Sequence, residues 1–247
     1  FLTWLGGGLE RITSFLTEQA HRGLQIESVA ATPWMFSRLW STLDPERNTE
    51  LLTYEVPGDG PTAAAAVLDP LLVVLLVGIL WLVIRAPATN RTFVLASLAI
   101  LAGLIVTNKV GSPQFVTWLG PPITAGIALL ESHQATGRSQ DPGSRQGPYS
   151  SRDPGWPRDP DSSRGPVWPS PPVESTDLVW SRLATLTLVI AFCTQLIYPW
   201  GYSALLEGAT VMTLVLTLRN ILIVVLFVMG LVQLAHAGRR RPAELAA

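Results

Sequence analysis

Long apolar stretches alternate with short polar ones along this chain. The apolar stretches occupy residues 66–84, 92–107, 115–130, 183–197 and 221–235. A helix needs about 20 predominantly apolar residues to cross a bilayer, and flanking Trp, Tyr and small residues extend the shorter stretches toward that length. The pattern therefore predicts an all-α polytopic membrane helix bundle with about five transmembrane helices.

The third stretch is interrupted by Gly-Pro-Pro at 120–122. Proline breaks backbone hydrogen bonding, which a membrane tolerates only where neighbouring protein or a water-filled cavity satisfies the exposed groups. We therefore expect a kinked helix there, either as a simple kink or as one that shapes a site.

The arginines give the orientation, because Lys and Arg gather in cytoplasmic loops. Arg85 and Arg91 follow the first span, five arginines lie at 138–164 between the third and fourth spans, and three follow the fifth. All three regions fall on one side of a five-span bundle. We expect a cytoplasmic C-terminus, with the 108–114 turn and the 198–218 region on the outer side.

Five segments follow from this pattern. They are 1–65, outer interfacial helices and a loop; 66–130, three spans; 131–177, a Pro-rich linker; 178–237, two spans with an outer re-entrant or interfacial helix; and 238–247, a basic cytoplasmic tail. The linker has too few apolar residues to offset the entropy of ordering, so we expect cytoplasmic disorder.

Smaller elements are expected on the outer side. Apolar residues at helical spacing predict amphipathic helices over 9–20 and 28–40, and the aromatic residues of the second favour a membrane interface. A short strand is expected over 49–56. A further outer helix is expected over 203–218, ending where a charged residue interrupts the apolar run.

Composition agrees with a membrane protein and excludes several functions. Only 14% of the residues are charged and 48% are hydrophobic, with a mean hydropathy of +0.35, whereas soluble domains carry about 25% charged residues. The net charge of −1 gives no basic surface for nucleic acid. The single cysteine, Cys193, and the absence of a metal-binding motif predict no disulfide framework, metal or cofactor.

The first polar cluster is HRGLQIES at 21–28. Arg22 offers a planar fork for phosphate or carboxylate, and His21 can transfer a proton or bind a phosphate oxygen. Gln25 and Glu27 add groups that hydrogen-bond hydroxyls. The alternative is a capped helix start with solvated charges.

Two more clusters fall on the outer side. Lys109, Ser112 and Gln114 lie in a short turn between two spans, where Lys109 can meet a lipid phosphate or merely anchor the surface. Arg219 interrupts an apolar run, and such a residue is a functional candidate by default. It either snorkels to the headgroups or faces an anionic ligand. The aromatic YPWGY at 198–202 is typical of an interfacial belt.

Three strings in this order carry a family resemblance: HRGLQIES at 21–28, KVGSPQFVTWL at 109–119, and Tyr198-Pro199 followed by LRN at 218–220. They resemble the C-terminal half of bacterial polytopic glycosyltransferases of family 87, which have the GT-C fold. The resemblance covers most of 9–130 and 178–236 and leaves out the Pro-rich linker.

The resemblance implies an enzyme that transfers a hexose, typically mannose, from a polyprenyl-phosphate donor to a lipid or glycan acceptor. The reaction takes place on the outer face of the bacterial plasma membrane, without a metal. Lys109, Arg22 and Arg219, with His21, are the expected partners of the leaving phosphate. The catalytic carboxylate is expected in upstream sequence, because we expect this chain to be part of a longer protein; Glu27 is the remaining candidate.

A non-catalytic membrane protein is the alternative: a transporter, a lipid-binding accessory subunit or a membrane anchor. An interrupted helix also occurs in transporters. Against transport, the chain has no internal repeat and no charged residue at the centre of a span.

Overall fold

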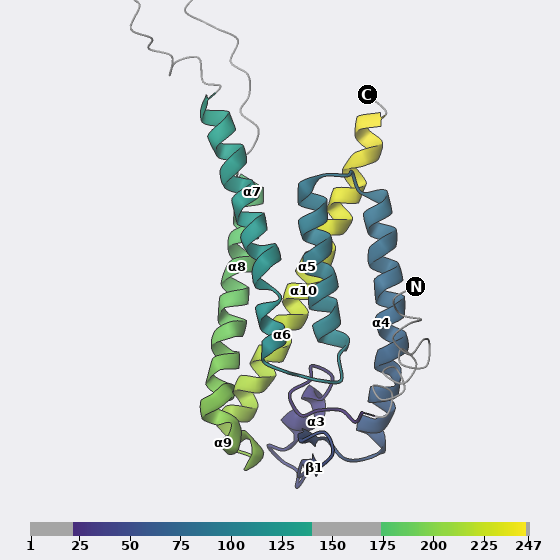
Figure 1. Ribbon diagram of the computed structural model, residues 1–247, viewed down its shortest axis with the longest axis vertical. Helices are drawn as coiled ribbons and strands as arrows, with labels where there is room; N and C mark the ends of the chain where they lie inside the picture. The colour runs from purple at the N-terminus through teal and green to yellow at the C-terminus, as the bar shows by residue number, and fades with distance from the viewer. Residues whose placement is uncertain (1–21, 140–173, 246–247) are drawn as a thin grey trace, which may run out of the picture.

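A computed structural model describes residues 22–139 and 174–245, and it is mostly helical. Its long helices lie lengthwise beside one another (Figure 1). They are α4 (Asp59–Arg85), α5 (Asn90–Thr107), α7 (Gly120–Ser139), α8 (Glu174–Gln195) and α10 (Thr210–Leu245). α5 and α10 form the centre, with α4 on one side and α7 and α8 on the other. The predicted helix over 9–20 and His21 lie outside the described residues.

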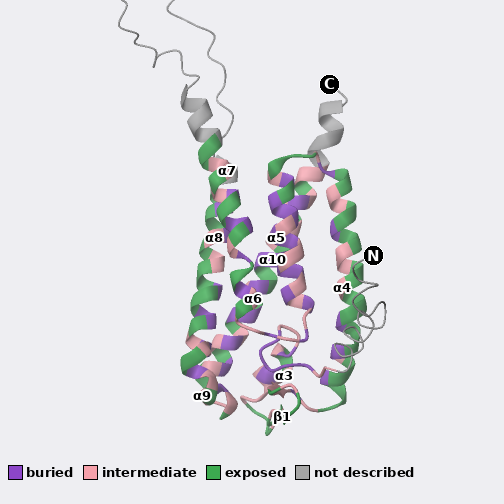
Figure 2. Cartoon of the chain, viewed as in Figure 1, coloured by how far each residue is buried: buried purple, intermediate pink, exposed green. Residues whose placement is uncertain are grey.

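Four of the described helical segments are long enough and apolar enough to cross a membrane. They are Asp59–Arg85, Asn90–Thr107, Leu178–Leu206 and Thr210–Gly238. Only 11% of the most apolar window in α4 is buried, against 56% in α5. Much of α4 is exposed (Figure 2), and its exposed apolar residues include Val73, Val77 and Leu80. A surface of this kind is stable where lipid, not water, surrounds it.

Within the described residues, four helices, and not the predicted five, are both long enough and apolar enough for a span by composition. α7 is 20 residues long, but its second half reads ESHQATGRS and is too polar for a span by composition. The predicted kink is also wrong, because a helix starts at that point. The short α6 (Gln114–Thr117) ends, and α7 begins at Gly120 with Pro121 and Pro122 in its first turn. Proline is tolerated there because the first-turn N–H groups have no helical partner.

The region after α8 also differs from the sequence prediction. A π-helical turn, η2 (Leu196–Gly201), leads into the short α9 (Tyr202–Leu206). Gly208, with a φ of 81°, turns the chain, and α10 then runs without interruption through Arg219. The outer helix predicted over 203–218 is therefore replaced by α9 and the first turns of α10. The polar pair at 219–220 does not end the helix, because both side chains find partners inside the protein.

Helix extends into both ends of the predicted linker 131–177. α7 continues to Ser139 and α8 begins at Glu174. The remaining linker residues, 140–173, lie outside the described part of the chain.

Before α4, the chain forms α3 (Thr32–Ser37) and a hairpin of β1 (Glu46–Asn48) and β2 (Thr53–Glu55). Arg47 pairs with Tyr54 in the antiparallel register. The strand predicted over 49–56 is therefore confined to β2, because residues 49–52 form the turn, where Leu52 has a φ of 53°. α3 is the helical part of the predicted 28–40 helix.

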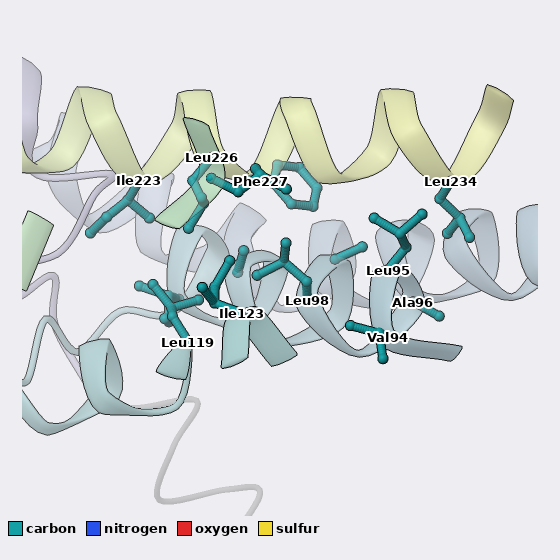
Figure 3. Packing of buried hydrophobic residues seen from close by; sticks show 14 of the residues in the cluster. Val94, Leu95, Ala96, Leu98, Leu119, Ile123, Ile223, Leu226, Phe227 and Leu234 are labelled. Atoms are coloured by element: carbon teal, nitrogen blue, oxygen red, sulfur yellow. The ribbon is translucent and has the colours of Figure 1, made fainter. Parts of the chain in front are cut away.

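Two apolar clusters hold these parts together. The larger one joins α5, α7 and α10 through residues such as Leu98, Ile123 and Phe227 (Figure 3). The smaller one lies at the α3 end of the bundle, where Leu24 and Ile26 contribute to the same buried cluster as Leu216 of α10. This second cluster fixes the segment before α3 against the helices, and it positions the polar residues described next.

Candidate functional site

A cavity of about 510 Å³ lies at the end of the bundle that carries α3 and the hairpin. Four separate segments line it. The lining residues, here called the cavity lining, are Arg22, Gln25, Glu27, Leu52, Thr53, Tyr54, Asn108, Val110, Ser112, Pro113, Gln114, Phe115, Tyr198 and Tyr202. A volume of this size is typical of a small-molecule site. The three sequence clusters, nearly 200 residues apart at their extremes, therefore all have members at or next to one cavity.

The segment at 22–28 forms a β-bridge at Gln25 before it turns at residues 26–28, and it is held on both sides. On one side the N–H of Ile26 donates to Tyr54 O at 3.1 Å, and the N–H of Val56 donates to Leu24 O at 2.8 Å. On the other side the N–H of Gln25 donates to Lys109 O at 3.0 Å. The segment thus lies between β2 and the 108–114 turn like a short central strand, which is why residues far apart in sequence share one cavity wall.

Gly111 allows the 108–114 turn to approach this segment closely. Its N–H donates to Gln25 Oε1 at 3.3 Å. A Cβ at Gly111 would collide with the backbone of Glu27 and Ser28. Backbone atoms cannot move aside as a flexible side chain can, so glycine is required here by the packing of two main chains.

Arg219, on α10, hydrogen-bonds both the 22–28 segment and the 108–114 turn. It is only 3% exposed. Its Nη1 donates to Glu27 O at 2.9 Å, its Nη2 to Gly111 O at 3.4 Å, and its Nε to Thr194 Oγ1 at 3.3 Å. The planar fork of a guanidinium can satisfy acceptors in several directions at once. Arg219 therefore acts as a clamp between α10 and the two loops.

Asn220 extends this clamp toward α3. Its Nδ2 donates to Ser28 O at 3.1 Å and to Thr32 Oγ1 at 2.9 Å, and its Oδ1 accepts from Arg219 Nη1 at 3.0 Å. The chain from the cavity wall into α3 is thereby fixed to α10.

Lys109 forms a second connection, to α4. Its Nζ lies 2.7 Å from Asp69 Oδ2, and its side chain is 6% exposed against 56% for that of Asp69. Because Lys109 directs its ammonium toward α4, it does not belong to the cavity lining. Asp69, Lys109, Arg219 and Asn220 are here called the backing layer.

Glu27 contributes a carboxylate to the lining. It is 6% exposed, and its Oε1 accepts a hydrogen bond from the Tyr198 hydroxyl at 2.9 Å. The rings of Tyr198 and Tyr202 lie 4.5 Å apart. Burial raises the pKa of Glu27 above its ordinary value of 4.5, although hydrogen bonds from Tyr202 and Tyr198 oppose this change.

Two polar atoms of the lining are buried without a hydrogen-bond partner: Arg22 Nε and Thr53 Oγ1. Unpartnered buried polar atoms are uncommon in native structures. Their position at a polar cavity favours a ligand that accepts hydrogen bonds, and the positive charge of Arg22 favours an anionic one.

The candidate residues from the sequence divide into three groups. Arg22, Gln25, Glu27, Ser112 and Gln114 belong to the cavity lining. Lys109 and Arg219 belong to the backing layer: the Lys109 ammonium pairs with Asp69, and the Arg219 guanidinium binds the backbone carbonyls of Glu27 and Gly111. His21 lies outside the described residues.

Sequence reasoning missed Tyr54 and Asp69. Asp69 carried a usable signal, because it is an ionisable residue inside an apolar run, as Arg219 is. Tyr54 carried none, since its role depends on how the hairpin and the turn meet. Tyr198 was attributed to an interfacial belt, yet its hydroxyl binds Glu27.

The fold and the site thus define a helical bundle with four helices fit to cross a membrane and a polar cavity at one end. Comparisons with protein-family models, with curated proteins and with solved structures found no match to this chain.

Proposed function

We propose that this chain is the C-terminal part of an integral membrane glycosyltransferase. It transfers a hexose, with mannose as the first candidate, from a polyprenyl-phosphate donor to a lipid or glycan acceptor. One observation carries the proposal: three segments that resemble family 87 glycosyltransferases meet at one cavity, in which Arg22 and Glu27 are the charged lining residues.

The position of the cavity supports a lipid-linked substrate. It lies at one end of helices whose outer faces are apolar, so a phosphate held there places a prenyl chain alongside those helices. The arginines at 85, 91 and 239–241 belong to the opposite end of the bundle. By the distribution of Lys and Arg, the cavity end faces outward and the C-terminus is cytoplasmic.

The proposed reaction needs no metal. An acceptor hydroxyl oxygen forms a bond to the anomeric carbon, the bond from that carbon to the phosphate oxygen breaks, and its electron pair stays on the leaving phosphate. Arg22 and the hydroxyl of Ser112 are placed to stabilise that negative charge. The sequence predicts that Lys109 and Arg219 also contact the phosphate. We propose an indirect role for both, because Lys109 pairs with Asp69 and Arg219 binds the carbonyl oxygen of Glu27.

The proton of the acceptor hydroxyl goes to a carboxylate base. Glu27 is the carboxylate of the described lining, and its Oε1 is occupied by Tyr198. We therefore assign the base to a carboxylate outside the described residues, as the family resemblance implies, and give Glu27 a role in binding the ligand.

The experiment is binding of farnesyl phosphate, a short lipid phosphate, to the chain in nanodiscs, followed by transfer of labelled mannose from polyprenyl-phosphate mannose by membranes containing the whole protein. Arg22→Gln removes the cation of the lining, and Arg47→Gln removes an exposed cation from β1 as the matched control. We expect Arg22→Gln to weaken binding and transfer about tenfold or more, since hydrogen bonds to charged groups contribute about 1.5–3 kcal/mol.

Equal behaviour of the two variants would contradict the proposal. Binding without any transfer by the whole protein would instead favour a lipid-binding accessory subunit, and movement of the ligand across the bilayer would favour a transporter.

A further inference from the structure

We propose that Glu27 recognises the sugar hydroxyls of the ligand and so makes the cavity selective for glycosylated over bare lipid phosphate. This inference rests on the proposed function, because it assigns the part of the same cavity that binds the sugar. Within the described residues, the charged members of the lining are one cation, Arg22, and one carboxylate, Glu27.

A carboxylate is an unfavourable neighbour for a site that holds only a phosphate. Ionised Glu27 has no donor to offer and repels an anion, whereas it accepts hydrogen bonds from hydroxyls at both oxygens. A sugar supplies several hydroxyl donors, whereas a fully ionised lipid phosphate supplies none. The lining therefore combines a group suited to the phosphate with a group suited to the sugar.

Glu27 is fixed at three points, which is what a recognition residue requires. Arg219 Nη1 holds its carbonyl oxygen, the Tyr198 hydroxyl holds Oε1, and Gly111 lies against its backbone. A carboxylate offers about four lone-pair positions, so acceptor capacity remains for a ligand after the phenol hydrogen bonds are made. Because the side chain is already ordered, little conformational entropy is lost when a hydroxyl binds.

Neutral groups surround this carboxylate. Gln25, Asn108 and Gln114 also belong to the lining, and their amides both donate and accept. Side chains of this kind are suited to the mixed donors and acceptors of a polyol. They cannot by themselves distinguish a sugar from a phosphate, which leaves the sign of the charge at Glu27 as the discriminating feature.

The test measures two dissociation constants for each variant in nanodiscs, for farnesyl phosphate and for mannosyl farnesyl phosphate. Glu27→Gln keeps the size and one acceptor oxygen but removes the negative charge. We expect this variant to bind the mannosylated probe about tenfold more weakly, as befits the loss of charge-assisted hydrogen bonds. Binding of farnesyl phosphate should stay the same or become tighter, because a like charge has been removed.

Glu55→Gln is the matched control, since Glu55 is an acidic residue of β2 that does not belong to the lining. It should leave the ratio of the two constants unchanged. Tyr198→Phe removes the hydroxyl that holds Glu27 Oε1 and keeps the ring, so it should lower the affinity of the mannosylated probe alone, by about threefold.

Three results would overturn the inference. In the first, Glu27→Gln weakens the binding of both probes equally, which is the mark of a purely structural role. In the second, it changes neither dissociation constant. In the third, Glu55→Gln changes the ratio of the two constants as much as Glu27→Gln does. If Glu27→Gln does not fold, Tyr198→Phe decides the question through the same ratio. A failure of the proposed function looks different: the parent chain then binds neither probe, whatever residue stands at position 27.

Discussion

The cavity lining and the backing layer both contain polar residues, but they differ in how many buried polar atoms have a hydrogen-bond partner. In the lining, Arg22 Nε and Thr53 Oγ1 are buried without a partner. In the backing layer, Arg219 donates to Glu27, Gly111, Thr194 and Asn220. The lining thus holds two buried polar atoms without a partner, whereas each side chain of the backing layer has at least one. This difference is what we expect if the lining serves the proposed ligand and the backing layer sets the shape of the cavity wall.

The strongest test of this distinction is Arg219→Met. The substitution leaves the buried carbonyls of Glu27 and Gly111 without a donor, and each such group costs about 1–3 kcal/mol. We expect the free energy of unfolding to fall by about 3 kcal/mol, measured by thermal unfolding in detergent micelles. Arg219→Lys should recover only part of the loss, because one ammonium cannot reach acceptors in all these directions.

Arg47→Met on the exposed face of β1 is the control and should change stability by less than about 0.5 kcal/mol. An Arg219→Met variant as stable as the parent, with weakened ligand binding, would move Arg219 from the backing layer to the lining.

The second test is Gly111→Ala. The new Cβ collides with the backbone of Glu27 and Ser28, so the 108–114 turn must move away from the cavity wall. We expect a loss of about 1–3 kcal/mol in stability, together with weaker ligand binding.

Gly78→Ala in α4 is the matched control. A Cβ there meets nothing within 4 Å, and alanine is the better helix former, so stability should rise by up to about 1 kcal/mol. Equal effects of the two substitutions would show that the close approach at Gly111 is not required.

The sequence predicted the helices and their order well, because an apolar run of membrane length allows few other structures. The predictions were wrong where proline or polar residues interrupt such runs. Pro121 begins α7 and does not kink a helix, and Arg219 lies inside one helix and does not end one. Pro121 is tolerated because α6 ends just before α7 begins. Arg219 is tolerated inside α10 because backbone carbonyls of Glu27 and Gly111 accept its hydrogen bonds.

The site was predictable only in part, for a physical reason. Short strings identified Arg22, Gln25 and Gln114, since their chemistry is visible in the residue types. Whether a cation faces a cavity or a neighbouring carboxylate depends on packing that no spacing encodes. The residue type of Lys109 predicts a phosphate ligand, whereas in the structure its Nζ lies 2.7 Å from Oδ2 of Asp69, 40 residues earlier.

The third test concerns that ion pair. Asp69→Asn removes a partner that is more than half exposed, so solvent already screens the interaction and we expect a loss below about 1 kcal/mol. Affinity for farnesyl phosphate should not change, because Lys109 still accepts the Gln25 N–H through its carbonyl. Tighter binding of farnesyl phosphate by Asp69→Asn would place Lys109 in the lining. Glu46→Gln on the exposed start of β1 is the control.

The fourth test concerns the pH dependence of stability. Burial raises the pKa of Glu27 in the folded protein, so the folded state keeps a proton that the unfolded chain has already lost. Stability is therefore greatest below the ordinary carboxyl range and falls as the pH rises through the raised pKa, by at most about 1.4 kcal/mol per pH unit for one group. Glu27→Gln should lack this fall, and Ser112→Ala, a neutral change in the lining, should retain it. Thermal midpoints measured from about pH 4 to 8 cover the relevant range. Parallel curves for the parent and Glu27→Gln would mean that the carboxylate is as well solvated in the cavity as in the unfolded chain, and the contrast between lining and backing layer would then rest on Arg22 and Thr53 alone.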